Sequence, residues 1–214
     1  MASKVFFDMT MSLDGFIAPE GMTMEHAADP GYKQWLQKWT DLQAWIFPQK
    51  FFRQNLKLGD DGQEGEENQL VEETFNRTGA SIMGANMFGG GEKFWPEEAP
   101  FHTKVFVLTD KVREPWERPG GTTFYFVNDG IESALKQAKE AAGERDVRIA
   151  GGANAVQQYL NAGLIDEFTI HHSPIFFGGG IPLLPNIDPA ISIRIKRTLV
   201  GKSATHVIYE VVKK

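Results

Sequence analysis

The feature that most constrains the fold is a pair of glycines between an apolar run and a helical pattern. Residues 147–150 are typical of a short buried strand, and residues 153–160 carry apolar side chains at helical spacing. A strand that turns into a helix through glycine leaves the first N–H groups of the helix free to bind an anion. A tight turn that needs glycine for its backbone angles explains this segment alone equally well.

Two further segments end a predicted strand in a similar way. Residues 81–88 read as strand, glycine and helix, and residues 105–110 read as a strand that stops at a hydroxyl and a carboxylate. The simpler interpretation is that these two segments and the glycine pair are three unrelated points at which loops begin. In open parallel sheets, however, ligands bind outside the carboxyl ends of the strands, so three such ends could share one crevice. A Rossmann fingerprint with its early G-x-G-x-x-G is absent.

The alternation of strands and helices predicts one α/β domain over residues 1–214. Strands and helices alternate between residues 80 and 162, which favours a mostly parallel central sheet flanked by helices. Three successive strand patterns without helices between them predict antiparallel C-terminal strands, at 167–177, 191–199 and 205–212. The spacing of apolar residues predicts a helix from Tyr32 to a break at Pro48, and residues 58–68 are acidic and Gly-rich, typical of a mobile insertion.

Composition excludes several classes of function. The net charge of −6 offers no basic surface for nucleic acid, and the absence of cysteine excludes thiolate chemistry and fits a reducing cytoplasm. Adjacent His171 and His172 would point to opposite faces of a strand, so no metal site is expected. No apolar run is long enough for a membrane helix, which predicts a protein that stays in the cytoplasm, away from membranes.

The order of these segments resembles the dihydrofolate reductase-like family, in particular the branch that shares the reductase (RibD C-terminal) domain of riboflavin biosynthesis. The similarity runs through MSLDGFIA at 11–18, IMGANMF at 82–88, VFVLTD at 105–110 and IAGGANAVQQYLNAGLIDEFTIHHSPIFFGGG at 149–180. The segment from about 22 to 75 matches poorly. The resemblance implies a dihydrofolate reductase-like fold and an NADPH-binding crevice.

The resemblance also implies where the cofactor would lie. Thr10 and Ile17 would contact the nicotinamide, and Leu108 and Thr109 would flank the adenosine ribose. The phosphate-binding residues would come from the two glycine junctions: Gly84, Ala85, Asn86, Met87, Gly151, Gly152, Ala153 and Asn154. Ala85 stands where dihydrofolate reductases often have a basic residue, so NADH is a possible cofactor besides NADPH. Lys111 or Arg113 could replace that contact to a 2′-phosphate.

The expected activity is that of an NAD(P)H-dependent oxidoreductase, transferring a hydride to a small pterin- or pyrimidine-like heterocycle or a related compound. A 5-amino-6-(5-phosphoribosylamino)uracil reductase-like activity is one possibility implied by the resemblance. A non-catalytic nucleotide-binding protein or a flavin-binding protein on the same fold is the alternative. Asp14, beside the expected nicotinamide position, is the candidate catalytic residue for orienting substrate or relaying a proton, although an Asp-Gly turn also explains it.

A homodimer is expected as well. The family resembled often pairs through its C-terminal strands. Four apolar residues there would supply an exposed edge: Phe168, Ile170, Ile175 and Phe177.

Overall fold

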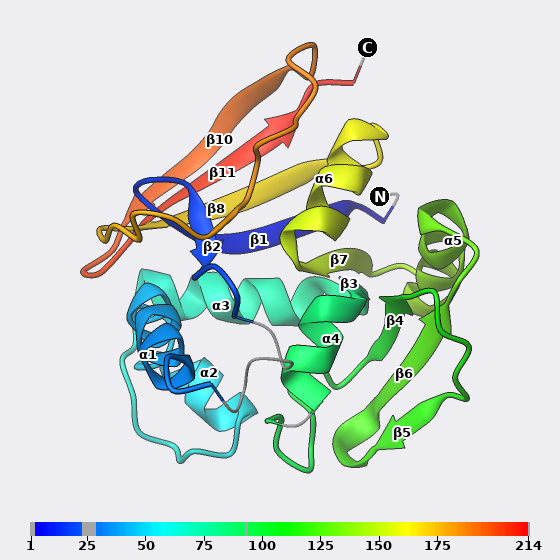
Figure 1. The fold of residues 1–214 in the computed structure, drawn as a ribbon, viewed down its shortest axis with the longest axis horizontal. Helices are drawn as coiled ribbons and strands as arrows, with labels where there is room; N and C mark the ends of the chain where they lie inside the picture. The colour runs from blue at the N-terminus through cyan, green and yellow to red at the C-terminus, as the bar shows by residue number, and fades with distance from the viewer. Residues whose placement is uncertain (1–2, 23–28, 93, 214) are drawn as a thin grey trace.

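The chain folds around a nine-stranded mixed sheet with the order β10-β11-β8-β1-β7-β3-β4-β6-β5 (Figure 1). A computed structural model describes residues 3–22, 29–92 and 94–213. The six central strands, from β8 to β6, run parallel, while β11, β10 and β5 run antiparallel to their neighbours. The strands are β1 (Val5–Ser12), β3 (Thr78–Gly84), β4 (Lys104–Leu108), β5 (Trp116–Arg118), β6 (Thr122–Val127), β7 (Asp146–Gly151), β8 (Glu167–Ser173), β10 (Ile193–Val200) and β11 (Thr205–Val211). The predicted fold class is confirmed. The strand predicted at 167–177 ends at Ser173 and runs parallel to β1, so β11 and β10 alone are the antiparallel C-terminal strands of this sheet among the described residues.

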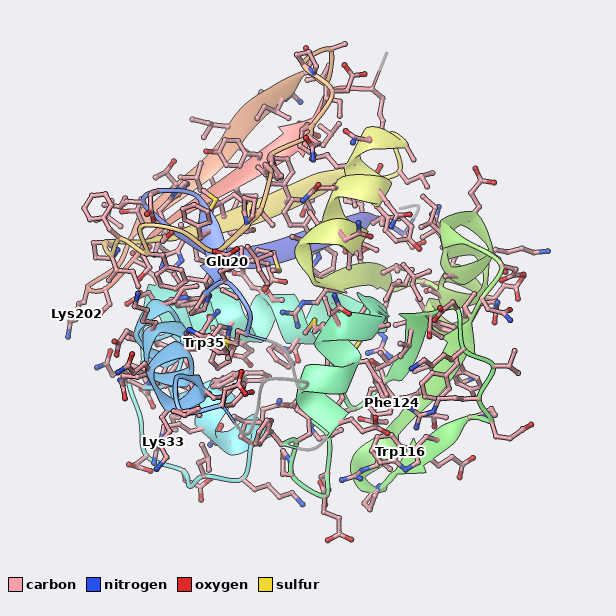
Figure 2. All side chains as sticks on the ribbon, in the orientation of Figure 1. Glu20, Lys33, Trp35, Trp116, Phe124 and Lys202 are labelled. Carbon is pink, nitrogen blue, oxygen red and sulfur yellow. The ribbon has the colours of Figure 1, made fainter. Side chains whose placement is uncertain are left out.

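Helices cover both faces of this sheet. On one face, α5 and α6 bury an aliphatic core that includes Ile82 and Ile149. On the other face, α4 covers an aromatic cluster in which Trp116 stacks on Phe124, with ring centroids 5.5 Å apart (Figure 2). The helices are α1 (Tyr32–Leu42), α2 (Lys50–Asn55), α3 (Glu66–Arg77), α4 (Ala85–Glu92), α5 (Ile131–Ala142) and α6 (Ala153–Asn161). A short pair of strands, β2 (Phe16–Ala18) and β9 (Ile181–Pro182), forms a separate ribbon.

The helix predicted to reach Pro48 ends earlier, at Leu42. Residues 43–48 form turns, and Trp45 within them is buried at 3% exposure. The Trp45 indole Nε1 donates a hydrogen bond to Oγ1 of Thr10 at 3.0 Å. Trp45 is thus tied to β1 by a contact between distant parts of the chain, which helical spacing alone could not reveal.

The acidic insertion is shorter than predicted. Its last residues, 66–68, lie in α3. Before them, Arg53 binds the Asp61 carboxylate at 2.7 Å and Lys50 binds Glu64 at 2.6 Å. The mobility of residues 58–65 stays a prediction.

Most of the apolar residues that were predicted to form an exposed dimer edge are buried. Phe168 and Ile170 are only 3% and 2% exposed, because they pack in the core beneath α6, and Phe177 is buried too. The exposed apolar side chains of this end include Phe176, which is 74% exposed, and Ile195 of edge strand β10, which is 65% exposed. The prediction of an exposed edge was therefore wrong for Phe168, Ile170 and Phe177, while Ile175 is half-buried. The homodimer itself stays a prediction. Within the described residues, no helix is long and apolar enough to cross a membrane.

Candidate functional site

The predicted cofactor residues lie along one edge of the sheet. Neighbouring parallel strands β1, β7, β3 and β4 all end there, and each contributes one predicted segment. Gly84, the last residue of β3, is in register with Leu108 of β4, and Met83 is in register with Gly151 of β7. Residues as far apart in the chain as Thr10 and Gly151 therefore lie at the carboxyl edge of the sheet, where ligands bind in open α/β folds.

The two glycine junctions are in close contact with each other. A Cβ atom added to Gly84 would lie 3.9 Å from the backbone nitrogen of Gly152. A Cβ atom added to Gly151 would lie 3.0 Å from Sδ of Met87, in the first turn of α4, and the φ angle of Gly151 is +129°. Gly151 is therefore required by its backbone angle and by the nearby Met87 side chain.

Gly152 differs from its neighbour. Its φ angle is −77°, which any residue can adopt, and an added Cβ would meet no protein atom within 4 Å. Gly152 is the N-cap of α6 and makes no side-chain cap. The open space above it adjoins the free N–H groups at the start of α6, and α4 begins at the neighbouring strand end. Two helix N-termini thus converge on a region that can accept anionic groups.

Leu108 and Thr109 lie one strand further along the same edge. The Thr109 backbone N–H donates to the carbonyl oxygen of Val127, and Thr109 Oγ1 accepts from the N–H of Lys111. The Arg113 guanidinium already has two partners: it lies 4.3 Å above the Phe126 ring and forms an ion pair with Glu92 at the end of α4. Of the two basic candidates for a 2′-phosphate contact, only Lys111 is free of a described ion pair.

Asp14 joins two loops beside this edge. Its carboxylate accepts hydrogen bonds from Oγ of Ser12 at 2.6 Å, from the N–H of Phe177 at 3.1 Å and from the N–H of Gly178 at 2.7 Å. The hydrogen bond from Ser12 is the largest cause that lowers the pKa of Asp14, with help from the two backbone groups. A carboxylate held ionised in this way fixes loop positions but is poorly suited to donate a proton.

Thr10 and Ile17 are both buried. Ile17 belongs to the aliphatic core that also contains Ala153 of α6. Thr10 faces the opposite side of the sheet, where its Oγ1 donates to Oε1 of Gln43 at 2.8 Å and accepts from Trp45. The segment between α1 and α2 therefore covers Thr10 on the side that faces away from the glycine junctions.

Beside Thr10 lies a buried polar cluster that the sequence analysis did not identify. Arg148 of β7 binds the Asp8 carboxylate of β1, with Nε 2.6 Å from Oδ1. His171 of β8, in register with Thr10, places Nε2 3.8 Å from Oδ2 of Asp8, which is within ion-pair range but too long for a hydrogen bond. Burial alone would raise the pKa of Asp8, but Arg148 and then His171 lower it overall.

The cluster continues from β8 into β11 and α3. His171 Nδ1 lies 2.7 Å from Nδ1 of His206, and His206 Nε2 lies 3.1 Å from Oε1 of Glu67. Burial lowers the pKa of His206 to about 3, and the nearby His171 and His172 contribute. Glu67, expected in a solvated loop, is therefore the partner of a buried histidine.

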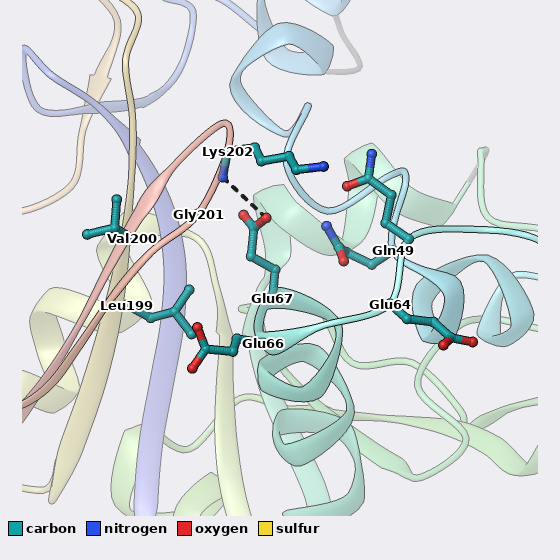
Figure 3. Close-up of a pocket in the computed structure, with 9 residues that line it drawn as sticks. Gln49, Glu64, Glu66, Glu67, Leu199, Val200, Gly201 and Lys202 are labelled. Atoms are coloured by element: carbon teal, nitrogen blue, oxygen red, sulfur yellow. Dashed lines mark hydrogen bonds between the residues drawn. The ribbon is translucent and has the colours of Figure 1, made fainter.

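An open hollow of about 500 Å³ lies on the far side of Glu67 (Figure 3). It is lined by residues of α3, the preceding loop and the β10–β11 turn, where the N–H of Lys202 points to the Glu67 carboxylate at 3.4 Å. This hollow is acidic and remote from the glycine junctions, so we do not assign it to the cofactor. It brings solvent close to Glu67.

One signal in the sequence could have revealed the cluster. Asp8 interrupts the apolar run VFFDMTM, and a charge in a buried strand requires a partner. Its partners lie about 140 or more residues away, so their identity was not readable. Among the described residues, no group of three or more His, Asp or Glu side chains is arranged to hold a metal ion.

Solved structures define the class of fold. A putative riboflavin biosynthesis protein from Shewanella sp. PV-4 is 21% identical, with a TM-score of 0.66, over 98% of this chain and 99% of that one. A dihydrofolate reductase from Enterococcus faecalis, solved with NADP(H), is 15% identical with a TM-score of 0.55, over 98% and 97% of the two chains. The protein therefore has a dihydrofolate reductase-like fold.

The family follows from the sequence. The profile of the RibD C-terminal domain matches residues 3–207, and the chain belongs to this family. Two uncharacterized proteins of Bacillus subtilis, YyaP and YwjB, are 32% and 34% identical over 73 residues, which is 34% of this chain. These matches span only 38% and 41% of the two relatives.

Proposed function

We propose that this protein is an NAD(P)H-dependent reductase that acts on a small heterocyclic or related compound with a C=N or C=O bond. The observation that carries the proposal is the convergence of two helix N-termini and the Gly151–Gly152 pair at the carboxyl edge of four parallel strands. Membership of the RibD C-terminal family supports it, since a Thermotoga maritima protein of similar fold is named a deaminase/5-amino-6-(5-phosphoribosylamino)uracil reductase.

The described residues fit a dinucleotide. The pyrophosphate would lie over Gly152, where an added side chain would meet open space, with residues 84–87 on its other side. Thr10 and Ile17 would flank the nicotinamide, and Leu108 and Thr109 the ribose. When bound, the nicotinamide supplies the hydride. The protein's part is to orient the two reactants and exclude water, a role that requires no nucleophilic side chain.

Asp14 enters this proposal as a positioning residue. By binding Phe177 and Gly178, it holds the loop after β8 against the turn after β1. Both loops flank the expected nicotinamide position, so Asp14 would set the shape of the entrance and leave proton transfer to another group.

The test is a titration with NADPH and NADH, followed by a turnover assay. We expect quenching of protein fluorescence at micromolar nucleotide, and oxidation of NADPH with some members of a panel of pterins, pyrimidines and quinoid compounds. Absence of binding by calorimetry at millimolar nucleotide would overturn the proposal. Binding without oxidation of any kind would favour the non-catalytic alternative, and a yellow colour on purification would favour a flavin.

A further inference from the structure

Two hydrogen bonds in series fix the orientation of the Gln43 carboxamide. The Trp45 indole N–H can only donate, so Oγ1 of Thr10 is the acceptor of the 3.0 Å contact between them. The Thr10 hydroxyl has one proton, which it donates to Gln43 at 2.8 Å, and only the Oε1 end of a carboxamide accepts. The Nε2 end of Gln43, with its two N–H groups, is therefore the end that Thr10 does not hold.

The amide nitrogen of Gln43 has no acceptor in the described part of the chain. The backbone of this residue is fixed, because Gln43 is the C-cap of α1 and its N–H donates to the carbonyl oxygens of Trp39 and Thr40. The side chain is half-buried and is held at its Oε1 end. Two donors are thus kept at a defined place, free to bind a ligand.

The polar side chains of β1 itself are already satisfied. Both carboxylate oxygens of Asp8 accept from one guanidinium, and the Ser12 hydroxyl donates its proton to Asp14. Thr10 donates once and accepts once. The strand that would lie along the nicotinamide therefore offers a substrate no free side-chain donor, and Gln43 supplies two.

Gln43 lies beside the residues proposed to flank the nicotinamide. Helix α1 packs against β1 and β2, the two strands that carry Thr10 and Ile17 (Figure 1). The Thr10 hydroxyl is on the face of the sheet opposite to the core beneath α6. Because Gln43 is in hydrogen-bond contact with Thr10, a heterocycle that lies against the nicotinamide at Thr10 also comes next to Gln43.

We infer that Gln43 determines substrate specificity by donating a hydrogen bond from Nε2 to an acceptor on the ring that is reduced. The inference rests on the proposed function and deepens it by naming the class of substrate. A ring carbonyl next to a ring N–H, as in a cyclic amide, presents such an acceptor, and its N–H can pair with the second lone pair of Oε1. Heterocycles with a cyclic amide edge are therefore preferred. Their amino counterparts are disfavoured, because two donors would face each other.

The test compares two matched substrates in the parent and in Gln43→Glu. Glutamate has the same length and still accepts the Thr10 proton, but it carries no N–H group. Quinoxalinone has a ring carbonyl beside its C=N bond, and aminoquinoxaline has an amino group in the same place. With NADPH, kcat/KM of the parent should be about tenfold or more higher for quinoxalinone than for aminoquinoxaline, the effect of one hydrogen bond. Gln43→Glu should reverse this preference, because its carboxylate accepts from the amino group.

The ratio of the two kcat/KM values separates recognition from structural damage, since a distorted site would lower both values together. Gln34→Glu makes the same substitution at an exposed position of α1 and should keep the parent ratio. If Gln43→Glu does not fold, Gln43→Met removes the donors without adding a charge and should abolish the preference. An unchanged ratio in a folded Gln43 variant overturns the inference.

The failures of the two proposals are distinguishable. If the protein binds neither nucleotide, the proposed function fails. If nucleotide binds but neither quinoxaline compound is reduced, calorimetry with the complex of protein and NADP⁺ measures their affinities in place of kcat/KM. Equal affinities of the two compounds, or binding of neither, would overturn the role of Gln43, while oxidation of NADPH by other compounds of the panel would leave the reductase in place.

Discussion

The indole of Trp45 is hydrogen-bonded to Thr10 across 3.0 Å and packs against the His171 ring. This contact attaches the segment between α1 and α2 to β1, one of the strands of the proposed cofactor edge. We predict that Trp45→Phe lowers the free energy of unfolding by about 1–3 kcal/mol, because Thr10 loses a buried donor and the ring is smaller. Trp39→Phe, at a partly exposed position, should cost much less in the same urea titration. If both variants lose the same free energy of unfolding, Trp45 has no special role.

The buried His206 predicts a specific dependence of stability on pH. Its pKa is lowered from 6.5 to about 3 in the folded protein, mainly by burial, so between these values the unfolded chain binds more protons. Stability must therefore rise with pH across this window and fall on acidification. From pH 6.5 to 5 the loss should be up to about 2 kcal/mol, measured by denaturant unfolding.

His206→Gln should reduce this slope, although the pKa of His172 is also lowered and leaves a remainder. The exposed His102 provides the control, as His102→Asn, because Asn tolerates the positive φ angle of this residue. A slope that is the same in the parent and in His206→Gln would show that His206 is not the responsible group.

The two glycines at the start of α6 should respond differently to substitution. Gly152→Glu places a carboxylate in the space expected for the pyrophosphate, with no backbone strain, so nucleotide affinity should fall by about 100-fold or more while the melting transition stays cooperative. Gly151→Ala should instead lower stability by about 1–2 kcal/mol through its positive φ angle. Gly152→Ala controls for the side chain without the charge. Retention of nucleotide affinity within about threefold in Gly152→Glu would place the cleft elsewhere.

Selectivity for NADPH should depend on Lys111. If its ammonium meets the 2′-phosphate, Lys111→Ala should weaken NADPH binding by about tenfold and leave NADH unchanged, the effect of one charge-assisted contact. Arg113→Ala should not alter selectivity, because this guanidinium is engaged with Phe126 and Glu92. Calorimetry with both nucleotides measures the two affinities. The opposite result for the two variants would assign the 2′-phosphate to Arg113.

We predict a homodimer formed through edge strand β10. Ile193 and Ile195 are 48% and 65% exposed on this unpaired edge, which is an apolar surface suited to pairing with a second copy. Ile195→Lys should shift the mass measured by light scattering at micromolar concentration from dimer to monomer. Leu58→Lys, at 55% exposure outside the strand, is the control. A monomeric parent would refute the prediction.

Local patterns in the sequence were sufficient to predict the fold, and they also nominated residues that the structure brings to one edge of the sheet. The glycine junctions at 84 and 151–152 can be recognised from a few neighbouring residues. The parallel arrangement of their strands then places them at the same edge of the sheet, whatever side chains make contact there. The polar cluster was missed for the opposite reason. His171 meets His206 from 35 residues away, and His206 meets Glu67 from 139 residues away, so only the folded chain pairs them. Trp45 fits the helical spacing of apolar residues but lies in a turn. Its hydrogen bond to Thr10 of β1 outweighs the helical preference of the surrounding sequence.

The position of β7 between β1 and β3 has a consequence for how the chain assembles its candidate binding edge. During synthesis, β1, β3 and β4 emerge early, but β1 cannot join the other two until residues 146–151 arrive and pair with both sides. Pairing of strands that are distant in the chain requires a long loop to close, and the entropy cost of this closure comes before the contacts can stabilise it. Folding is therefore slower. A nascent chain ending before β7 should therefore hold only the β3–β4 part of the edge. Capture of the dinucleotide would mark the late step of folding at which the two parts of the sheet become one.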